Sequence, residues 1–476
     1  MLSELLKCET GVGQGDVLSP NLFNILINDL PKCFEKNGDT PQLWDQYINC
    51  LLYADDLVLM SLSESGLQKQ LDKLDEYCKD WGLNINISKT KTMIMARKVS
   101  SSKNYIFRID GEILECVKCY KYLGVEIHSN GNFQKSMANL CSRGWKAIFK
   151  MQRALKNVNV TTATKFNLFD KLISPILCYN SEVWGSTLHT GNEYDETKFW
   201  KKSENLPLEQ LHIQFCKNAL GVHRKATNAA VRGEVGRYPI AIRIVKAMLR
   251  YVKHMKGNDY YNPLLKAAQI ECDRLYEMKG TWFYTLRQIF NVFNVKYTNT
   301  IPDEYIMNKL LKAMKASYEK YWKQIIMNNG SDDGKLSLYR KIKQGFNMEG
   351  YLNDVKTQKF RRALTALRIS AHRLEIETGR YSKSYVPRKD RLCSLCLQRQ
   401  AKCVGDEFHA VMECPQFKQD RDELFKCIQE KCGRFNKLNL WDKFMYLLTC
   451  EGSAVALASK YIYTVLEIPR NSPVRT

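Results

Sequence analysis

The sequence predicts an α+β protein: short strands and two helices come first, a long helical region follows, and a small cysteine-rich segment comes last. Residues 1–128 mix short apolar runs with turn signals, and residues 129–385 carry apolar residues at helical spacing. Cysteines bunch after residue 386. Hydrophobic residues make up 45% and charged residues 26% of the 476 positions, which excludes a disordered or fibrous chain.

Two helices are predicted in the first region. Ser19 suits an N-cap and Pro20 suits the first position of a helix. One apolar face then follows, formed by Leu22, Phe23, Leu26, Ile27 and Leu30. The second helix has an apolar stripe made by Leu67, Leu71, Leu74, Cys78 and Trp81, and Gly82 ends it.

Three strand signals accompany these helices. The run CLLYADDLVLM at 50–60 predicts two short buried strands joined by a turn at Asp55 and Asp56. Asp110 and Gly111 predict a hairpin turn within residues 107–114. Residues 120–127 predict one further strand, interrupted by Gly124.

Asp55 and Asp56 are the first candidates for chemistry. Two adjacent carboxylates in an apolar hairpin repel each other and lose hydration, and no basic residue lies within four positions of them. Mg²⁺ would resolve this conflict, because it binds one or two carboxylates together with phosphate oxygens. A turn that simply points into water is the competing interpretation.

The net charge of +22 predicts a polyanionic partner, most simply nucleic acid, with an acidic membrane surface as the weaker option. No apolar run approaches the length of a membrane span, and the first residues do not resemble a signal peptide. We therefore expect an intracellular protein, nuclear or cytoplasmic, with no membrane partner.

Two basic stretches are candidates for contact with a phosphate backbone. Arg243, Lys246, Arg250 and Lys253 recur at helical spacing. Residues 356–391 hold eleven Lys and Arg against three acidic residues, a balance of +8 that includes Arg361, Arg362 and Arg368. The competing interpretation is a solvated helix face.

The cysteine-rich segment predicts one structural zinc site. Cys393 and Cys396 form a Cys-x2-Cys pair, twelve residues separate Cys396 from His409, and four separate His409 from Cys414. Three thiolates and one imidazole suit tetrahedral Zn²⁺, and a helical turn would bring His409 near Cys414. Cys403 is a substitute ligand, and ordinary buried cysteines beside a surface histidine are the alternative.

Four blocks resemble, in order and spacing, the reverse transcriptases of non-LTR (LINE-type) retrotransposons. Tyr53-Ala54-Asp55-Asp56 is similar to the family's aspartate box, and residues 11–24 (GVGQGDVLSPNLFN) resemble the preceding palm block. Residues 82–91 (GLNINISKTK) resemble the lysine-bearing block, and residues 120–124 (YKYLG) the primer-grip strand. The helical and cysteine-rich parts are also similar to such elements.

The resemblance implies an RNA-directed DNA polymerase. Residues 1–128 would be a partial palm of antiparallel strands packed on helices, 129–255 a helical thumb, 256–385 a basic helical connector, and 386–476 the zinc-binding end. Its substrates would be deoxynucleotides, and its partners an RNA template and a DNA primer or target. Two Mg²⁺ ions would support nucleotidyl transfer.

The family's residue roles carry over onto matching positions. Asp55 matches the Mg²⁺ ligand, and Asp56 matches the carboxylate that supports it. Gln14, Gly15 and Tyr53 match positions that contact template or nucleotide. Lys89 matches the lysine that acts on the leaving pyrophosphate. The turn at Leu123 and Gly124 matches the primer grip.

Two departures from the family pattern limit what the resemblance implies. The family's first aspartate block should stand before Gly11, and no such block occurs in these 476 residues. We therefore expect an N-terminally truncated chain with an incomplete two-metal site and negligible polymerase activity. Gly13 stands where the family usually has a basic residue. The rival interpretation is a catalytically inactive nucleic-acid-binding protein, and a translated fragment without a role is a third.

Overall fold

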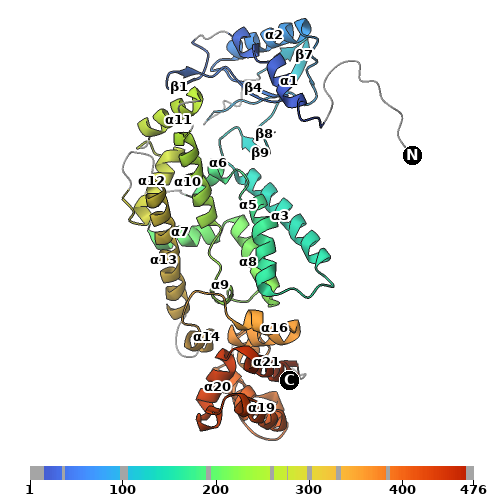
Figure 1. Cartoon of the computed structure of the whole chain (residues 1–476), viewed down its shortest axis with the longest axis vertical. Helices are drawn as coiled ribbons and strands as arrows, with labels where there is room; N and C mark the ends of the chain where they lie inside the picture. Colours follow the sequence, from blue (N-terminus) through green and yellow to red (C-terminus); the bar gives the residue numbers. More distant parts are fainter. Residues whose placement is uncertain are drawn as a thin grey trace, which may run out of the picture. The chain divides into compact units, whose positions relative to one another are not determined.

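Small, mostly antiparallel sheets and many helices make up the structure, a computed structural model (Figure 1). It describes residues 15–34, 38–96, 105–188, 195–257, 262–275, 277–296, 303–328, 334–381 and 386–467. The mixed α+β class is confirmed. The chain divides into a first unit, residues 1–136, 250–287 and 298–302, and a second unit, residues 137–249, 288–297 and 303–476.

The sheets of the first unit are short hairpins and one three-stranded sheet. The pairs β1–β2, β3–β4 and β8–β9 are antiparallel, and the three-stranded sheet has the order β5-β7-β6 with β5 parallel to β7. The strands are β1 Gln42–Leu43, β2 Gln46–Tyr47, β3 Cys50–Tyr53, β4 Asp56–Leu59, β5 Lys91–Thr92, β6 Phe107–Ile109, β7 Glu112–Cys116, β8 Cys119–Tyr122 and β9 Val125–His128.

The main helix of this unit, α2 (Glu64–Asp80), confirms the prediction from its apolar stripe. The Ser63 side chain caps it by accepting a hydrogen bond from the Gly66 amide at 3.0 Å. Gly82 follows it with a φ of +64°, a left-handed conformation that suits glycine. Helix α2 packs on β6, and the two share a core with Leu71, Leu74, Phe107, Ile109 and Leu114.

The first predicted helix is shorter than its apolar face suggested. Helix α1 spans Ser19–Leu26, so Ser19 is its first residue and not its N-cap, and no side chain caps it. A separate 3-10 turn covers Leu30–Cys33. Leu30 is buried, but Leu22 stays exposed, so only the end of the predicted face enters the core. Tyr77 of α2 holds this segment by donating to Asp29 at 2.7 Å.

Two hairpin turns each contain two consecutive residues with positive φ; the sequence pattern predicts the first turn and not the second. Asp110 and Gly111 have φ values of +48° and +76° and join β6 to β7, as predicted. Leu123 and Gly124 have φ values of +44° and +80°. They reverse the chain between β8 and β9, so the single interrupted strand predicted for residues 120–127 is wrong.

Helix α11 (Pro263–Arg274) completes the first unit together with parts of two others. It packs on β1 and β2, and the Arg274 guanidinium lies 5.1 Å from the centre of the Trp44 ring. Residues of α10 (Ala241–Gly257) and α12 (Trp282–Val292) are divided between the two units.

Helices make up the regular secondary structure of the second unit in its described residues, apart from two isolated β-bridges. None of the helices in the described part of the chain is long and apolar enough to cross a bilayer. The further helices are α3 Gln134–Ala154, α4 Thr162–Leu168, α5 Ser174–Leu177, α6 Ser181–Trp184, α7 Glu196–Glu204, α8 Pro207–Leu220, α9 Asn228–Val235, α13 Glu304–Asn328, α14 Ser337–Ile342, α15 Tyr351–Asp354, α16 Gln358–Arg368, α17 Glu375–Thr378, α18 Ser394–Leu397, α19 Lys418–Lys431, α20 Leu440–Thr449 and α21 Gly452–Glu467.

A buried ionic cluster joins α8 to α9 in this unit. Glu209 accepts hydrogen bonds from Arg232, from the Ile240 amide at 2.5 Å, and from His212 Nδ1 at 3.0 Å. Burial alone would raise the pKa of Glu209, but Arg232 and His212 lower it to about 2. Burial lowers the pKa of His212 to about 4, so its imidazole is neutral at pH 7.

A second buried cluster centres on Arg368 of α16. Its guanidinium donates to Glu234 of α9 at 3.0 and 3.1 Å, to Glu349 at 2.6 Å, and to the Leu448 carbonyl of α20 at 2.6 Å. Tyr351 also donates to Glu234, at 2.5 Å. Glu234 is fully buried, so its charge depends on these donors.

Replacing Arg368 should therefore destabilise the second unit strongly. We expect Arg368→Met to cost about 3–5 kcal/mol, because it leaves the Glu234 carboxylate buried without its cation. Arg362→Met, on the exposed side of the same helix, should stay within about 0.5 kcal/mol of the wild type. Urea unfolding followed by circular dichroism measures both; equal midpoints for the two variants would contradict the assigned role of Arg368.

Candidate functional site

The aspartate hairpin lies at the end of β3 and β4. Tyr53 pairs with Asp56 as the last residues of the ladder, and Ala54 adopts a left-handed φ of +52° in the turn. The predicted hairpin is therefore confirmed, but both carboxylates are exposed. The burial cost that the apolar flanks suggested does not arise, because β3 and β4 are themselves only partly buried.

Two interactions of strand β8 link the aspartate hairpin to other predicted motifs. Burial raises the pKa of Tyr122, and the charge of Asp56 raises it further, so the end of β8 lies near the Asp56 carboxylate. Tyr120, also in β8, contacts the Lys89 carbonyl at 3.5 Å through its hydroxyl. The Lys89 side chain is exposed. The aspartate hairpin, the lysine-bearing turn and the β8–β9 hairpin thus form one cluster within the first unit.

The remaining predicted palm residues are placed less completely. Gly15 is exposed with a φ of +90°, and a Cβ there would meet no atom within 4 Å. Gln14, like Gly11 and Gly13, lies outside the described residues. The Tyr53 side chain is 63% exposed, which leaves its ring accessible beside the two aspartates. Leu123 and Gly124 form the β8–β9 turn described above.

The four predicted zinc ligands converge in the second unit. One ligand atom from each of Cys393, Cys396, His409 and Cys414 lies within 4.8 Å of the others, and all four residues are buried. The Cys396 sulfur lies 3.3 Å from His409 Nε2 and 3.8 Å from the Cys414 sulfur. Cys403 is outside this group, and its carbonyl instead accepts the Cys393 amide at 2.8 Å.

Local backbone geometry explains why this spacing works. A bridge between Leu392 and Val404 closes the loop that carries Cys393 and Cys396. His409 and Cys414 stand at the two ends of a π-helical turn, His409–Glu413, in which the Cys414 amide donates to the His409 carbonyl at 2.8 Å. The predicted helical turn is confirmed, although it is wider than an α-helix.

Neighbouring side chains orient the cluster. His409 Nδ1 lies 3.4 Å from Glu413, so its Nε2 is left to face the sulfurs. Hydrogen bonds from Cys414 and His409 lower the pKa of the Cys393 thiol to about 3, which favours a thiolate there. Three thiol groups and one imidazole, buried together, are a donor set that tetrahedral Zn²⁺ takes in structural sites.

The basic stripe on α10 is exposed as predicted. Arg243, Lys246, Arg250 and Lys253 all have exposed side chains, whereas Ile244, Val245, Met248 and Val252 are buried. Arg243 already forms hydrogen bonds within the protein, to Asp170 at 2.7 Å and to Ser174 at 3.0 Å.

Two cations predicted to contact a phosphate backbone are instead internal. Arg368 is 1% exposed and fully engaged with Glu234, Glu349 and a carbonyl oxygen. Arg361 is 4% exposed and donates to the Val355 carbonyl at 2.8 Å. The prediction is wrong for these two, because α16 turns their side of the helix into the core. Arg362 is exposed, as expected.

A further basic group lies around His223. Burial lowers the pKa of His223, and Lys335, Lys217, Lys225 and Arg373 lower it further, so four cations surround this imidazole. They come from the end of α8, the loop after it, and two distant segments. Lys335 and Arg373 lie more than a hundred residues from His223 in the sequence, so local spacing around the histidine does not reveal them.

Comparison with known proteins matches the N-terminal part of the chain, which includes the aspartate and lysine motifs. The family described as "Reverse transcriptase (RNA-dependent DNA polymerase)" matches residues 2–127. The chain is 24% identical over 190 residues to an RNA-directed DNA polymerase from mobile element jockey of Drosophila melanogaster, covering 38% of this chain and 20% of that protein. It is 28% identical over 184 residues, 37% of this chain and 20% of the relative, to a probable RNA-directed DNA polymerase from transposon BS of the same species.

A third relative belongs to another element. This is a retrovirus-related Pol polyprotein from the type-1 retrotransposable element R2 of Bradysia coprophila, 30% identical over 136 residues, 27% of this chain and 16% of that protein. The chain thus spans a fifth or less of the length of these three relatives. It contains a reverse transcriptase domain and is homologous to RNA-directed DNA polymerases of non-LTR retrotransposons.

Proposed function

We propose that this chain serves RNA-directed DNA synthesis by a non-LTR retrotransposon, with an RNA template, a DNA primer or target, and deoxynucleotides as substrates. The observation that carries this is the cluster of Asp55, Asp56, Tyr122 and the Lys89 turn within a domain of the reverse transcriptase family. Under this proposal, residues 1–128 are the palm, 129–255 the thumb, 256–385 the connector and 386–476 the zinc-binding end.

The exposed aspartates fit a catalytic divalent cation such as Mg²⁺. They offer adjacent carboxylate oxygens open to solvent, and within the described residues neither has a cationic partner. When bound, the metal would stabilise the charge on the attacking and leaving oxygens. Asp55 is the proposed ligand, Asp56 supports it, and the Tyr122 side chain lies within reach of the charge of Asp56.

The other residues of the cluster would position substrates. Lys89 offers an exposed ammonium group that can approach the leaving pyrophosphate. The turn at Leu123 and Gly124 would support the primer end, and Gly15 leaves room for a template base because it carries no side chain. Tyr53 presents an exposed aromatic ring to the nucleotide.

A second candidate function is nucleic-acid binding without synthesis. The exposed residues Arg243, Lys246, Arg250, Lys253 and Arg362 favour it, together with the cations around His223. Both functions need these contacts, so only the behaviour of the aspartate hairpin separates them.

We propose Zn²⁺ as the occupant of the Cys393, Cys396, His409 and Cys414 cluster. Four protein ligands complete a tetrahedron, so the site would be structural and would hold no open position for a substrate. Its role would be to fix the loop and the π-helical turn against α17, where Glu375 accepts from the Ser394 amide at 3.0 Å.

Metal binding at the aspartate hairpin is the test of the synthetic function. With RNA template, DNA primer and deoxynucleotide present, Asp55→Asn should weaken Mn²⁺ binding by at least tenfold, because a neutral amide replaces a charged ligand. Electron paramagnetic resonance measures free Mn²⁺. Any primer extension by the wild type should be lost in the same variant.

The matched control is Asp110→Asn, which changes another exposed aspartate at a hairpin turn of the same unit. It should leave Mn²⁺ binding unchanged. The loss of its surface ion pair with Lys79 should cost little stability, so the variant should also stay folded. If the two variants bind Mn²⁺ equally well, the hairpin is not a metal site, and nucleic-acid binding without synthesis becomes the better assignment.

Zinc content tests the second metal. Protein purified without chelator should contain one zinc per chain, and Cys414→Ser should remove most of it and make residues near 386–417 sensitive to protease. Cys403→Ser should keep the zinc, because Cys403 stands outside the cluster. Elemental analysis decides; zinc lost from the Cys403 variant and kept in the Cys414 variant would show that the ligand set is wrong.

Salt dependence tests the phosphate contacts. Affinity for RNA should fall steeply between about 50 and 200 mM salt. Replacing both Lys246 and Arg250 by Gln should reduce the logarithmic slope by about 1.4 to 1.8. Fluorescence anisotropy with a labelled RNA measures this. Replacing Lys309 and Lys312, two exposed lysines of α13, is the matched control; the same slope change in both pairs would refute a specific role for α10.

A further inference from the structure

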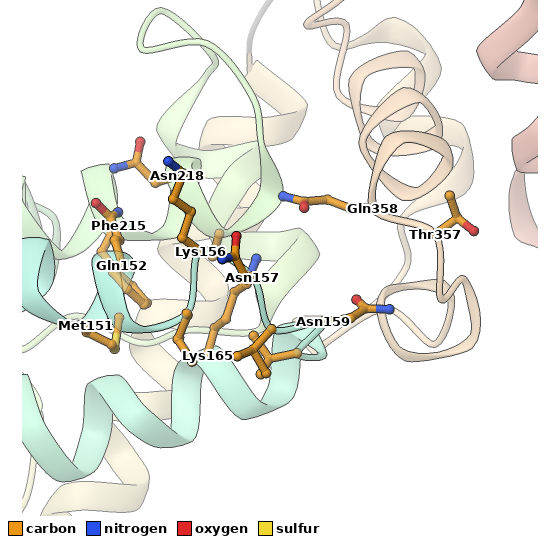
Figure 2. Close-up of a pocket in the computed structure, with 14 residues that line it drawn as sticks. Met151, Gln152, Lys156, Asn157, Asn159, Lys165, Phe215, Asn218, Thr357 and Gln358 are labelled. Carbon is orange, nitrogen blue, oxygen red and sulfur yellow. The ribbon is translucent and has the colours of Figure 1, made fainter.

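A cavity of about 610 Å³ lies in the second unit where four segments meet (Figure 2). The end of α3 and the loop after it supply Met151 to Val160, α4 supplies Lys165, α8 supplies Phe215 and Asn218, and the start of α16 supplies Thr357 and Gln358. The volume is within the usual range of small-ligand sites. None of the sequence motifs described above predicts it.

The charge of this cavity is one-sided. Its lining includes Lys156 and Lys165 and contains no acidic residue. Within the described part of the chain, neither lysine has a carboxylate partner. Burial lowers the pKa of Lys165, and the nearby Arg361 lowers it further. Lys156 and Lys165 thus line the cavity, and Arg361 lies near Lys165, with no acidic residue in the lining to compensate their charge, which favours an anionic ligand.

Carboxamides form most of the remaining polar lining. Gln152, Asn157, Asn159, Asn218 and Gln358 all contribute to it. In Figure 2, Gln358 extends from the start of α16 toward the side where Asn157 and Asn218 lie. The oxygen of Asn218 accepts from Gln214 at 3.0 Å, so its amino group stays available. Carboxamides offer a donor and an acceptor together, as the edges of nucleobases do.

The floor and one end of the cavity add two further features. Met151, Phe215 and Ala219 give a buried apolar base on which a planar ring can rest. No side chain caps the N-terminus of α16, and its first residues line the cavity, so its N–H groups add to the attraction for an anion.

We propose that this cavity binds one unpaired nucleotide of single-stranded RNA. Lys156 and Lys165 hold its phosphate, and the carboxamides of Asn157, Asn218 and Gln358 bind the edge of its base. This inference rests on the proposed function, because the RNA that supplies the nucleotide is the one a reverse transcriptase domain handles. It goes beyond that function by adding a base-reading site remote from the aspartate hairpin in sequence.

The test uses the full chain and adenosine 5′-monophosphate as the probe, with binding followed by calorimetry. Lys165→Gln should weaken this binding about tenfold, because it removes a charge-assisted contact in a half-buried site. Lys309→Gln, an exposed lysine of α13, should not change it. Adenosine without phosphate should bind weakly and respond little to Lys165→Gln. Equal affinity for the nucleotide in both lysine variants would overturn the site.

Further measurements identify the ligand and separate a loss of binding from a loss of folding. A single-stranded RNA decamer should displace the monophosphate; binding that persists at saturating RNA would make a free nucleotide the ligand and overturn the RNA assignment. Asn157→Ala, in an exposed loop, should weaken binding severalfold even if Lys165→Gln disturbs folding, and no effect would contradict base reading. Asp55→Asn should leave this binding intact, so failure here is distinguishable from failure of the synthetic function.

Discussion

The ion pair between Glu234 and Arg368 is the constraint on which much of the second unit depends. It joins α9 to α16 across 134 residues of sequence, and Arg368 extends it to the Leu448 carbonyl at the end of α20. Glu349 and Lys343 complete a set of two acids and two bases, so the buried charge balances. Helix α16 is thereby fixed, and its first residues reach the cavity beside α8.

The first unit depends on smaller contacts between hairpins. Its strands are two to five residues long, and such hairpins gain stability only when something covers them. Helix α2 does this for β6 and β7, where the Gln68 side chain pairs with both backbone groups of Arg108. The candidate active site needs a further link, and the proximity of Tyr122 to Asp56 supplies it. The charge of Asp56 thus acts on a tyrosine that lies 66 residues away in the sequence.

Local signals could be predicted from the sequence, and contacts between distant segments could not. The Asp110-Gly111 turn, helix α2 and the Cys₃His cluster each depend on residues within about twenty positions, and all three are present in the structure. The sequence predicts phosphate contact for Arg368, because its partner, Glu234, lies far away in the sequence and leaves no local signal. The residue pattern at 120–127 predicts a single strand because Leu123 carries no turn signal; only the family resemblance at Leu123 and Gly124 implied the turn that the structure has there. The cavity could not be predicted, because its lining comes from four segments spread between residues 151 and 358 of the sequence.

The same distinction changes what the net charge of +22 means. The net charge counts every cation equally, but three arginines form ion pairs inside the fold. Arg232 pairs with Glu209, Arg237 with Asp170, and Arg368 with Glu234. These residues should govern stability and hardly affect binding to a polyanion. Exposed cations such as Lys246 and Arg250 should instead affect binding to a polyanion and have little effect on stability. Lys165 lies between the two classes, because it is half-buried and has no acidic partner among the described residues. That combination, rather than exposure alone, marks a cation as available to a specific anionic ligand.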